Sequence, residues 1–250
     1  MKTDLNVTEI VETCLLAGKI MLQSGAETHR VEDTMQRMAH SFGVTGSQSY
    51  VTPTGIIFST EGTEPTNFLR ISERSTDLHK IAAVNNISRK ISSGDLSLSI
   101  ANEKLKKLDV ESQTYPLFIQ VIAAALVSGC FTIMFQGSWP DFIPAMTAGG
   151  IGFYAMVRFH NLVEIRFFAE FLASLIIGLL SFLFINAGVG AEIDKIIIGA
   201  VMPLVPGLLI TNAVRDLMAG HLVAGLSKGA EAFLTAFAIG AGIAVGFSFL

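Results

Sequence analysis

Hydrophobic and charged residues are distributed very unevenly along the chain. Twenty-six of its 38 Asp, Glu, Lys and Arg residues lie in the first 111 positions. Five long segments after that point contain no charged residue: 112–140, 142–157, 171–191, 196–214 and 232–250. A helix needs about 17–25 predominantly apolar residues to cross a bilayer, whereas a core helix of a soluble protein alternates its faces. The pattern predicts a soluble domain over residues 1–111 and a membrane domain over residues 112–250.

The hydrophobic period changes twice within the first 111 residues. Three- and four-residue spacing predicts a helix over 6–23, and a second helix follows Gly25. Between residues 44 and 71, short β-rich runs alternate with turn-forming segments, which is typical of a small antiparallel meander. Helical spacing returns at about 76–92 and 99–109. The order ααβββαα predicts an α+β domain.

The apolar segments that follow predict an all-α bundle of about five transmembrane helices, at 116–136, 141–158, 167–187, 196–213 and 223–249. Lys and Arg residues gather before the first crossing, between the second and third, and between the fourth and fifth. Because cytoplasmic loops are enriched in Lys and Arg, we expect the N-terminal domain in the cytoplasm and the C-terminus outside. Many transporters combine two inverted repeats, so a five-helix unit is expected to pair with a second chain or with itself.

Composition narrows the function classes. With 51% hydrophobic and 15% charged residues, the chain is too apolar for a purely soluble protein. A net charge of −4 without a basic stripe argues against a nucleic-acid partner. Cys14 and Cys130 form neither a metal motif nor a disulfide framework, and the polar start of the chain predicts no cleavable signal peptide. We find no nucleotide fingerprint or positioned nucleophile, so we expect no enzyme activity, no cofactor and no metal.

The densest polar cluster of the N-terminal domain lies at residues 24–33. It reads either as a helix stop followed by a helix with acidic first turns, or as a motif that binds a ligand or grips the membrane domain. Ser24 with His29 could form a hydrolytic pair, but that spacing is too common to indicate one. The candidate motif residues, including a turn further along the chain, are Ser24, Gly25, Glu27, Arg30, Glu32, Asp33, Thr52, Pro53 and Gly55.

The fourth predicted crossing contains two prolines and a glycine, Pro203, Pro206 and Gly207. Each proline removes a backbone donor and clashes with the preceding turn, so the helix must break or kink there. Irregular backbone at membrane depth is tolerated where protein or a water-lined cavity satisfies it. One turn later come three polar residues, Asn212, Arg215 and Asp216. The segment is either a kink with a charge cluster at the helix end, or a substrate or gating element.

Glu231 is the acid that lies deepest in the last predicted crossing. Eight residues of helix place it about 12 Å along the span, because an α-helix rises 1.5 Å per residue. An acid at that depth is costly unless it faces a cavity or is paired, which makes it a functional candidate. Lys228, one turn earlier, could neutralise it, and the residue would then have a structural role.

Three segments together resemble one family: SGAETHRVEDT at 24–34, TPTGI at 52–56 and MPLVPGLLITNAVRDLMAGHLVAGLSKGAEAF at 202–233. They are similar to the signature stretches of the threonine/serine exporter (ThrE-like) family, specifically its N-terminal half. Full-length members resemble this chain followed by a second membrane half, and split members pair such a chain with a separate small membrane protein. The larger chain of a split bacterial succinate exporter is similar to this one. The resemblance implies export of a small amino acid or dicarboxylate across the bacterial inner membrane.

We therefore expect one subunit of a two-component secondary exporter that works by alternating access in the lipid bilayer. Pro203, Pro206 and Gly207 would form its hinge. Asn212 and Arg215 would contact the solute and Asp216 would orient Arg215, while Glu231 would carry a coupled proton. The alternative is a non-transporting regulatory or assembly subunit whose cytoplasmic domain binds a ligand. The sequence does not choose between succinate and threonine or serine as the solute.

Overall fold

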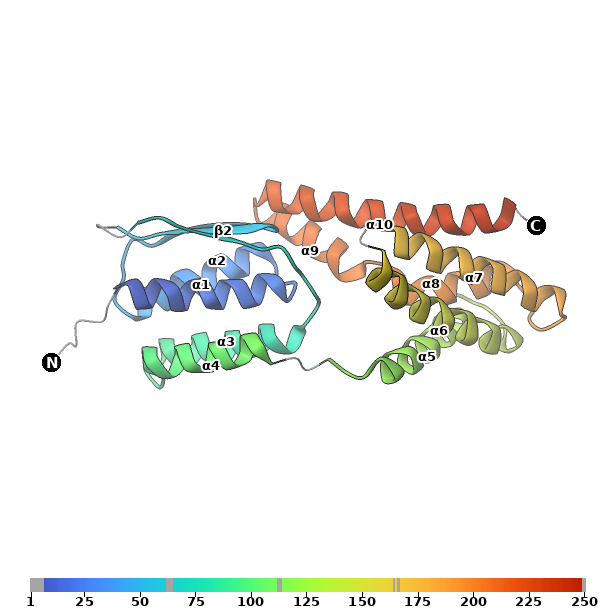
Figure 1. The fold of residues 1–250 in the computed structure, drawn as a ribbon, viewed down its shortest axis with the longest axis horizontal. Coiled ribbons are helices and arrows are strands. Elements are labelled where there is room, and N and C mark those ends of the chain that lie inside the picture. The colour runs from blue at the N-terminus through green and yellow to red at the C-terminus, as the bar shows by residue number, and fades with distance from the viewer. Residues whose placement is uncertain (1–6, 62–64, 112–113, 164, 166, 249–250) are drawn as a thin grey trace. The chain divides into compact units, whose positions relative to one another are not determined.

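The computed structural model describes residues 7–61, 65–111, 114–163, 165 and 167–248, which group into two compact units (Figure 1). Unit 1 comprises Met1–Ser112 together with Leu208–Ala230. Unit 2 comprises Gln113–Gly207 together with Glu231–Leu250. The sequence pattern places one boundary near residue 111, whereas in the structure a segment from the apolar part of the chain folds with the N-terminal residues.

The N-terminal part of unit 1 has the predicted order of two helices, three strands and two helices. These are α1 (Val7–Gln23), α2 (Thr28–Ser41), β1 (Gln48–Thr52), β2 (Gly55–Ser59), β3 (Asn67–Arg70), α3 (Leu78–Ser92) and α4 (Leu98–Val110). The strands form an antiparallel sheet in the order β1-β2-β3, with Val51 opposite Ile56 and Ile57 opposite Phe68. The α+β prediction for this segment is confirmed.

Helices α1 and α2 form the middle of three layers. On one side α1 packs against β2 and α2 against β1; on the other side both helices pack against α3, and α1 also against α4 (Figure 1). Because it is covered on both sides, α1 buries nine of its 17 residues. Gly18 permits the close approach of α2, since a Cβ there would lie 2.4 Å from Met35 Sδ. Burial also raises the pKa of the Cys14 thiol to about 12, which leaves that thiol unreactive.

Unit 2 is built around one central helix. Its first four helices are α5 (Leu117–Met134), α6 (Trp139–Leu162), α7 (Phe168–Asn186) and α8 (Ile193–Val201), and α6 packs against the other three. The part of α10 (Leu222–Ser248) from Glu231 onward also belongs to this unit. Small residues allow this, because a Cβ on Gly149 would lie 2.0 Å from Ser128 Oγ. The buried hydroxyls are satisfied within their own helices: Ser128 donates to the Ala124 carbonyl and Thr132 to the Ser128 carbonyl.

The helix break predicted at the two prolines is confirmed. Helix α8 ends at Val201, a short 3-10 helix η1 (Met202–Leu204) follows, and α9 (Gly207–Met218) begins after Pro206. The two segments are bent by 64°. Each proline lies where a regular helix would need its backbone N–H, so the chain turns into the 3-10 helix and then restarts.

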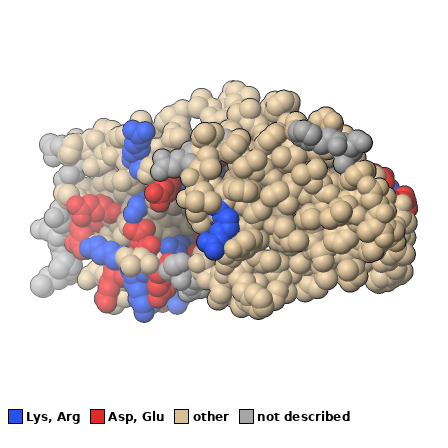
Figure 2. Space-filling view, turned by 45° about the vertical axis from the view of Figure 1, so that its right-hand side comes forward, with Lys and Arg blue, Asp and Glu red and all other residues tan. Residues whose placement is uncertain are grey.

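Among the residues that the structure describes, three helices are long and apolar enough to cross a membrane: α5, α7 and α10 (Leu222–Ser248). The bent pair adds a fourth if it forms one span. Helix α6 covers the second predicted crossing but is not among these helices, since Pro144, its glycines and its polar ends make it less apolar. Figure 2 shows a wide uncharged surface, with most of the Lys, Arg, Asp and Glu side chains on one side of the view and a few at the opposite edge.

One buried carboxylate ties the start of α6 to the loop between α7 and α8. The Asp141 side chain accepts a hydrogen bond from the Ser138 N–H, which is part of a capping box, and another from the Ser138 hydroxyl. It also accepts from the N–H groups of Ala191 at 2.6 Å and Glu192 at 3.0 Å. All four donors lie within unit 2.

Replacing Asp141 with Asn turns one acceptor oxygen into a donor that faces N–H groups, and leaves buried donors without an acceptor. We expect Asp141→Asn to lower the free energy of unfolding by about 1–3 kcal/mol. Thermal or chemical unfolding of the purified protein in detergent would measure this. The control is Asp194→Asn, because Asp194 is exposed and pairs with Lys195 at 3.8 Å. Equal stability of the two variants would contradict a structural role for Asp141.

Candidate functional site

The turn between α1 and α2 brings the polar residues of the N-terminal motif together. Gly25 has φ +87°, which favours glycine, and its N–H donates to the Leu22 carbonyl while that of Ala26 donates to the Met21 carbonyl. This pair of bonds is a Schellman motif, and it ends α1. Three residues later α2 begins, with Glu27 as its N-cap. The turn thus presents the carbonyls of Gly25 and Ala26 and the first N–H of α2 to α9 and α10.

Asp216 of α9 occupies the N-terminal end of α2. Its carboxylate is fully buried and accepts two hydrogen bonds from Thr28, from the N–H at 2.9 Å and from the hydroxyl at 2.9 Å. The partial positive charge at a helix N-terminus favours a carboxylate in this position. His29 Nδ1 lies 3.6 Å from the same carboxylate.

Lys228 of α10 neutralises Asp216. The two groups are 2.8 Å apart, and Lys228 is almost completely buried. Its ammonium also donates to the Ala26 carbonyl and to the Thr28 hydroxyl, both at 3.2 Å. An ammonium has three N–H donors, and each has an acceptor here. We call Thr28, Asp216 and Lys228 the buried lock.

Glu27 lies beside the buried lock and is held by two arginines. Arg215 Nη1 donates to one carboxylate oxygen at 2.6 Å, and Arg30 Nη1 donates to the other at 3.2 Å. Burial alone would raise the pKa of Glu27, but the bond from Arg215 and the bond and charge of Arg30 outweigh it, so the pKa lies below its usual value. Glu27 is therefore ionised at neutral pH.

Glu32 links α2 to the sheet edge and to the segment before α10. One of its oxygens accepts a hydrogen bond from the Val51 N–H at 2.8 Å, and the other lies 3.8 Å from His221 Nε2. Burial raises the pKa of the Glu32 carboxyl above its usual value, despite the bond from Val51. Asp33, by contrast, is exposed and pairs with Arg37 on the same helix.

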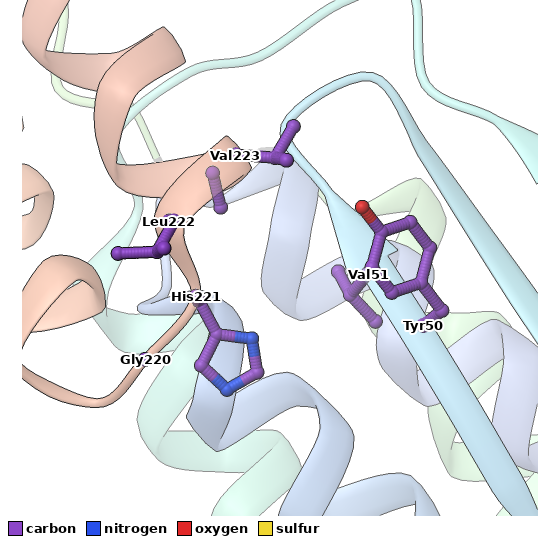
Figure 3. A pocket seen from close by; sticks show the side chains of 7 residues that line it. Tyr50, Val51, Gly220, His221, Leu222 and Val223 are labelled. Carbon is purple, nitrogen blue, oxygen red and sulfur yellow. The ribbon is translucent and has the colours of Figure 1, made fainter.

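Two cavities of unit 1 adjoin this cluster. The first, which we call the two-arginine pocket, has a volume of about 450 Å³ and is lined by Glu27, His29, Arg30, Arg215, Met218 and Ala219. The second has a volume of about 190 Å³ and lies between β1 and the segment Gly220–Ala224. Figure 3 shows Tyr50 and Val51 of β1 on one side of the second cavity, and His221 and Leu222 on the other.

The structure joins two sets of residues that are nearly 190 positions apart in the sequence. Asn212 Nδ2 donates to the Gly25 carbonyl at 2.8 Å, so the candidate residues Asn212, Arg215 and Asp216 all contact the α1–α2 turn. Ser24 is buried in this turn, and its carbonyl accepts from the Asp77 N–H. Thr52, Pro53 and Gly55 form the β1–β2 turn, while Pro203 and Pro206 belong to unit 2.

Two of the expected pairings have different partners in the structure. We expected Asp216 to orient Arg215, but Asp216 pairs with Thr28 and Lys228, and Glu27 holds Arg215. Lys228 could have neutralised Glu231, yet its ammonium is directed to Asp216. The sequence reasoning missed Thr28 and His221. Lys228 could be noticed because it is a lysine within an apolar segment. Thr28 lies in a polar turn, where a threonine indicates no particular role.

Within the residues that the structure describes, no group of three or more His, Cys, Asp or Glu side chains is placed to hold a metal ion. The chemistry that the cluster offers is hydrogen bonding and charge. Its positive groups near the surface are guanidinium groups, which bind carboxylates through paired N–H donors.

Comparisons with known proteins identify the family to which the chain is similar. The model of a family described as "Putative threonine/serine exporter" matches residues 12–250. The chain is 24% identical over 248 residues to a "Probable threonine/serine exporter" of Mycobacterium tuberculosis, which covers 97% of this chain and 46% of that protein. It is 25% identical over 242 residues to the "Probable succinate transporter subunit YjjP" of Escherichia coli, which covers 94% of this chain and 92% of that protein.

A further relative is a fungal protein. Pheromone-regulated membrane protein 10 of Kluyveromyces lactis is 25% identical over 242 residues, which is 91% of this chain but 24% of that protein. The chain thus spans about half the length of its mycobacterial relative and a quarter of the fungal one. No solved structure matches the chain.

Removing Lys228 would leave the Asp216 charge buried without its cation. We expect Lys228→Met to lower the free energy of unfolding by about 3–5 kcal/mol, and the double variant Asp216→Asn with Lys228→Met to recover part of that loss. Unfolding of the purified protein in detergent would measure both. The control is Arg37→Met, which breaks the exposed pair with Asp33 and should cost at most about 1 kcal/mol. A loss from Lys228→Met as small as the control's would contradict the buried lock.

Proposed function

This chain belongs to the threonine/serine exporter family, and we propose that it is one subunit of a secondary exporter in a bacterial inner membrane. The observation that carries the proposal is the 64° break between α8 and α9, followed within α9 by Asn212, Arg215 and Asp216. Broken helices with polar residues beside the break are typical of transporter binding sites, since the free backbone groups must line a cavity or be covered by protein.

The proposed partner is a second small membrane subunit. The Escherichia coli relative is itself named a transporter subunit and is almost fully covered by this chain, which supports a two-component assembly. The mycobacterial relative is about twice as long, as expected if it joins both components in one chain. A second copy of this chain is the alternative partner, because inverted repeats also arise by pairing of identical units.

For the membrane topology we propose five crossings. Helix α6 would be the crossing that is surrounded by other helices of the protein and not by lipid. Helix α6 has 24 residues, enough for about 36 Å at 1.5 Å per residue, and it packs against α5, α7 and α8. A helix surrounded by protein needs less apolar surface than one that faces lipid. The proposed orientation, with the N-terminus in the cytoplasm and the C-terminus outside, is supported by the placement of Lys and Arg in the sequence.

The proposed solute is a small metabolite that bears a carboxylate, either a dicarboxylate such as succinate or the amino acids threonine and serine. The relatives' names include both classes, and both present a carboxylate to Arg215. Pro203, Pro206 and Gly207 would form the hinge of the alternating-access motion. Asn212, which holds the Gly25 carbonyl, and Asp216, in the buried lock, would link that motion to the α1–α2 turn.

A second candidate function is a regulatory or assembly subunit that does not itself carry the solute. The two-arginine pocket favours it, because this pocket could hold a ligand that changes the export rate without itself being exported. In that case variants of the pocket would change the export rate without changing which solute is exported.

Transporter-deficient cells that express this chain, with and without the candidate second subunit, test the exporter proposal. We expect extracellular succinate, or threonine and serine, to accumulate only when both chains are present. Mass spectrometry of the medium gives the readout, and membrane fractionation controls for insertion of both chains. If nothing accumulates although both chains are in the membrane, the exporter proposal fails for these solutes.

Glu231 is the proposed proton-coupling residue. We expect Glu231→Gln to abolish export driven by the proton gradient while the chain remains in the membrane, because an amide cannot release a proton. Export in the presence and absence of a protonophore would measure the coupling. Glu192→Gln, an exposed acid in the loop before α8, is the control and should export as the wild type does. Unchanged export by Glu231→Gln would exclude the coupling role.

A further inference from the structure

The two guanidinium groups beside the α1–α2 turn share one carboxylate. Arg215 and Arg30 each donate to a different oxygen of Glu27. The side chain of Glu27 is only 7% exposed, whereas those of Arg215 and Arg30 are 58% and 45% exposed. The acid thus lies beneath two cations that reach the surface, and the three side chains together carry a net charge of +1.

Two neighbouring acids are paired with other cations: Asp216 with Lys228 within the buried lock, and Asp33 with Arg37. A third, Glu32, accepts a hydrogen bond from the Val51 N–H and, among the described residues, contacts neither arginine. A guanidinium has five N–H donors. In the described part of the chain, Arg30 and Arg215 each donate one of them, to Glu27. Most of their donors therefore remain available to a ligand.

Both guanidiniums border the two-arginine pocket, whose volume is about 450 Å³. Binding sites for small molecules have volumes of roughly 300–1,000 Å³, so a metabolite of four or five carbon atoms fits. Met218 and Ala219 supply the apolar part of the lining, and His29 adds a ring with polar atoms. The pocket lies wholly within unit 1.

We propose that the two-arginine pocket binds a small carboxylate ligand, and that Glu27 is the internal competitor which the ligand's carboxylate displaces. The inference rests on the proposed function, in which a carboxylate-bearing metabolite is exported. It names Arg30 as a second contact, beside Arg215, and Glu27 as the group that sets affinity. Glu27 already shows that the paired guanidiniums accept a carboxylate with one oxygen on each.

Displacement of the Glu27 side chain would affect the neighbouring buried lock. Glu27 is the N-cap of α2, and the next residue, Thr28, donates twice to Asp216. A ligand that takes Arg215 from Glu27 removes one of the bonds between α9 and the α1–α2 turn, and leaves the bond from Asn212 to Gly25. Occupancy of the pocket is thereby coupled to how firmly α9 is held.

Binding of radiolabelled succinate to the purified full-length protein in detergent tests the pocket, by equilibrium dialysis. Glu27→Gln should raise the affinity roughly tenfold, because the competing charge is lost, and Arg30→Gln should lower it roughly tenfold. Arg37→Gln is the matched control for Arg30→Gln, since Arg37 lies on the same helix, is 48% exposed and pairs with an acid. Glu103→Gln, on the exposed face of α4, controls for the loss of one acid.

Competition by unlabelled threonine, inorganic phosphate and succinamide defines the ligand class. We expect threonine to compete and the uncharged succinamide not to; displacement by phosphate at equal or lower concentration would overturn the assignment to carboxylates. Equal affinity of wild type, Glu27→Gln and Arg30→Gln would also overturn the proposal. If Glu27→Gln does not fold, the comparison of the succinate affinities of Arg30→Gln and Arg37→Gln tests the proposal by itself.

Export and binding separate the two proposals. If the paired chains export succinate but Arg30→Gln binds it as the wild type does, the pocket is wrong and the exporter function stands. If binding depends on Arg30 and Glu27 but no solute is exported, the pocket stands and the exporter function fails.

Discussion

Unit 1 depends on the burial of a single carboxylate. Asp216 has no contact with solvent, and its charge is balanced by Lys228 and by the N-terminal end of α2, through two hydrogen bonds from Thr28. A buried charge whose partner is removed costs several kcal/mol, so these groups hold their positions together or not at all. For this reason α9 and the first turns of α10 fold with a domain that lies far from them in the sequence.

Glu27, one residue before Thr28, is held in a different way. Its partners are guanidinium groups that reach the surface, where water can compete for them and the net interaction is weaker. Two carboxylates at the same helix end thus have different roles. The one in the buried lock is fixed by an ammonium with every donor occupied, and the one in the two-arginine pocket is held by donors that a ligand could also reach.

Unit 2 is held together by close contact of small side chains. Glycines of α6 and α8 bring the backbones so near that an added methyl group would collide with Ser128 or Thr132. Within a lipid bilayer the hydrophobic effect does not drive helices together, so close packing and internal hydrogen bonds stabilise their association instead. The buried hydroxyls of Ser128, Thr132 and Ser181 donate to carbonyls of their own helices, which leaves the outward faces free to be apolar.

The sequence alone determined the elements of this protein. The spacing of apolar residues gave the order of helices and strands in the N-terminal domain, and Pro203 and Pro206 gave the break, because these signals act between residues close together in the chain. Only the tertiary structure decided which side chains pair. Asp216 could have met Arg215, the residue before it, and Lys228 could have met Glu231, one turn further along. Instead Asp216 meets Lys228 and Thr28, since a buried charge is stable only where several donors from different elements converge, and that convergence is not encoded in local spacing.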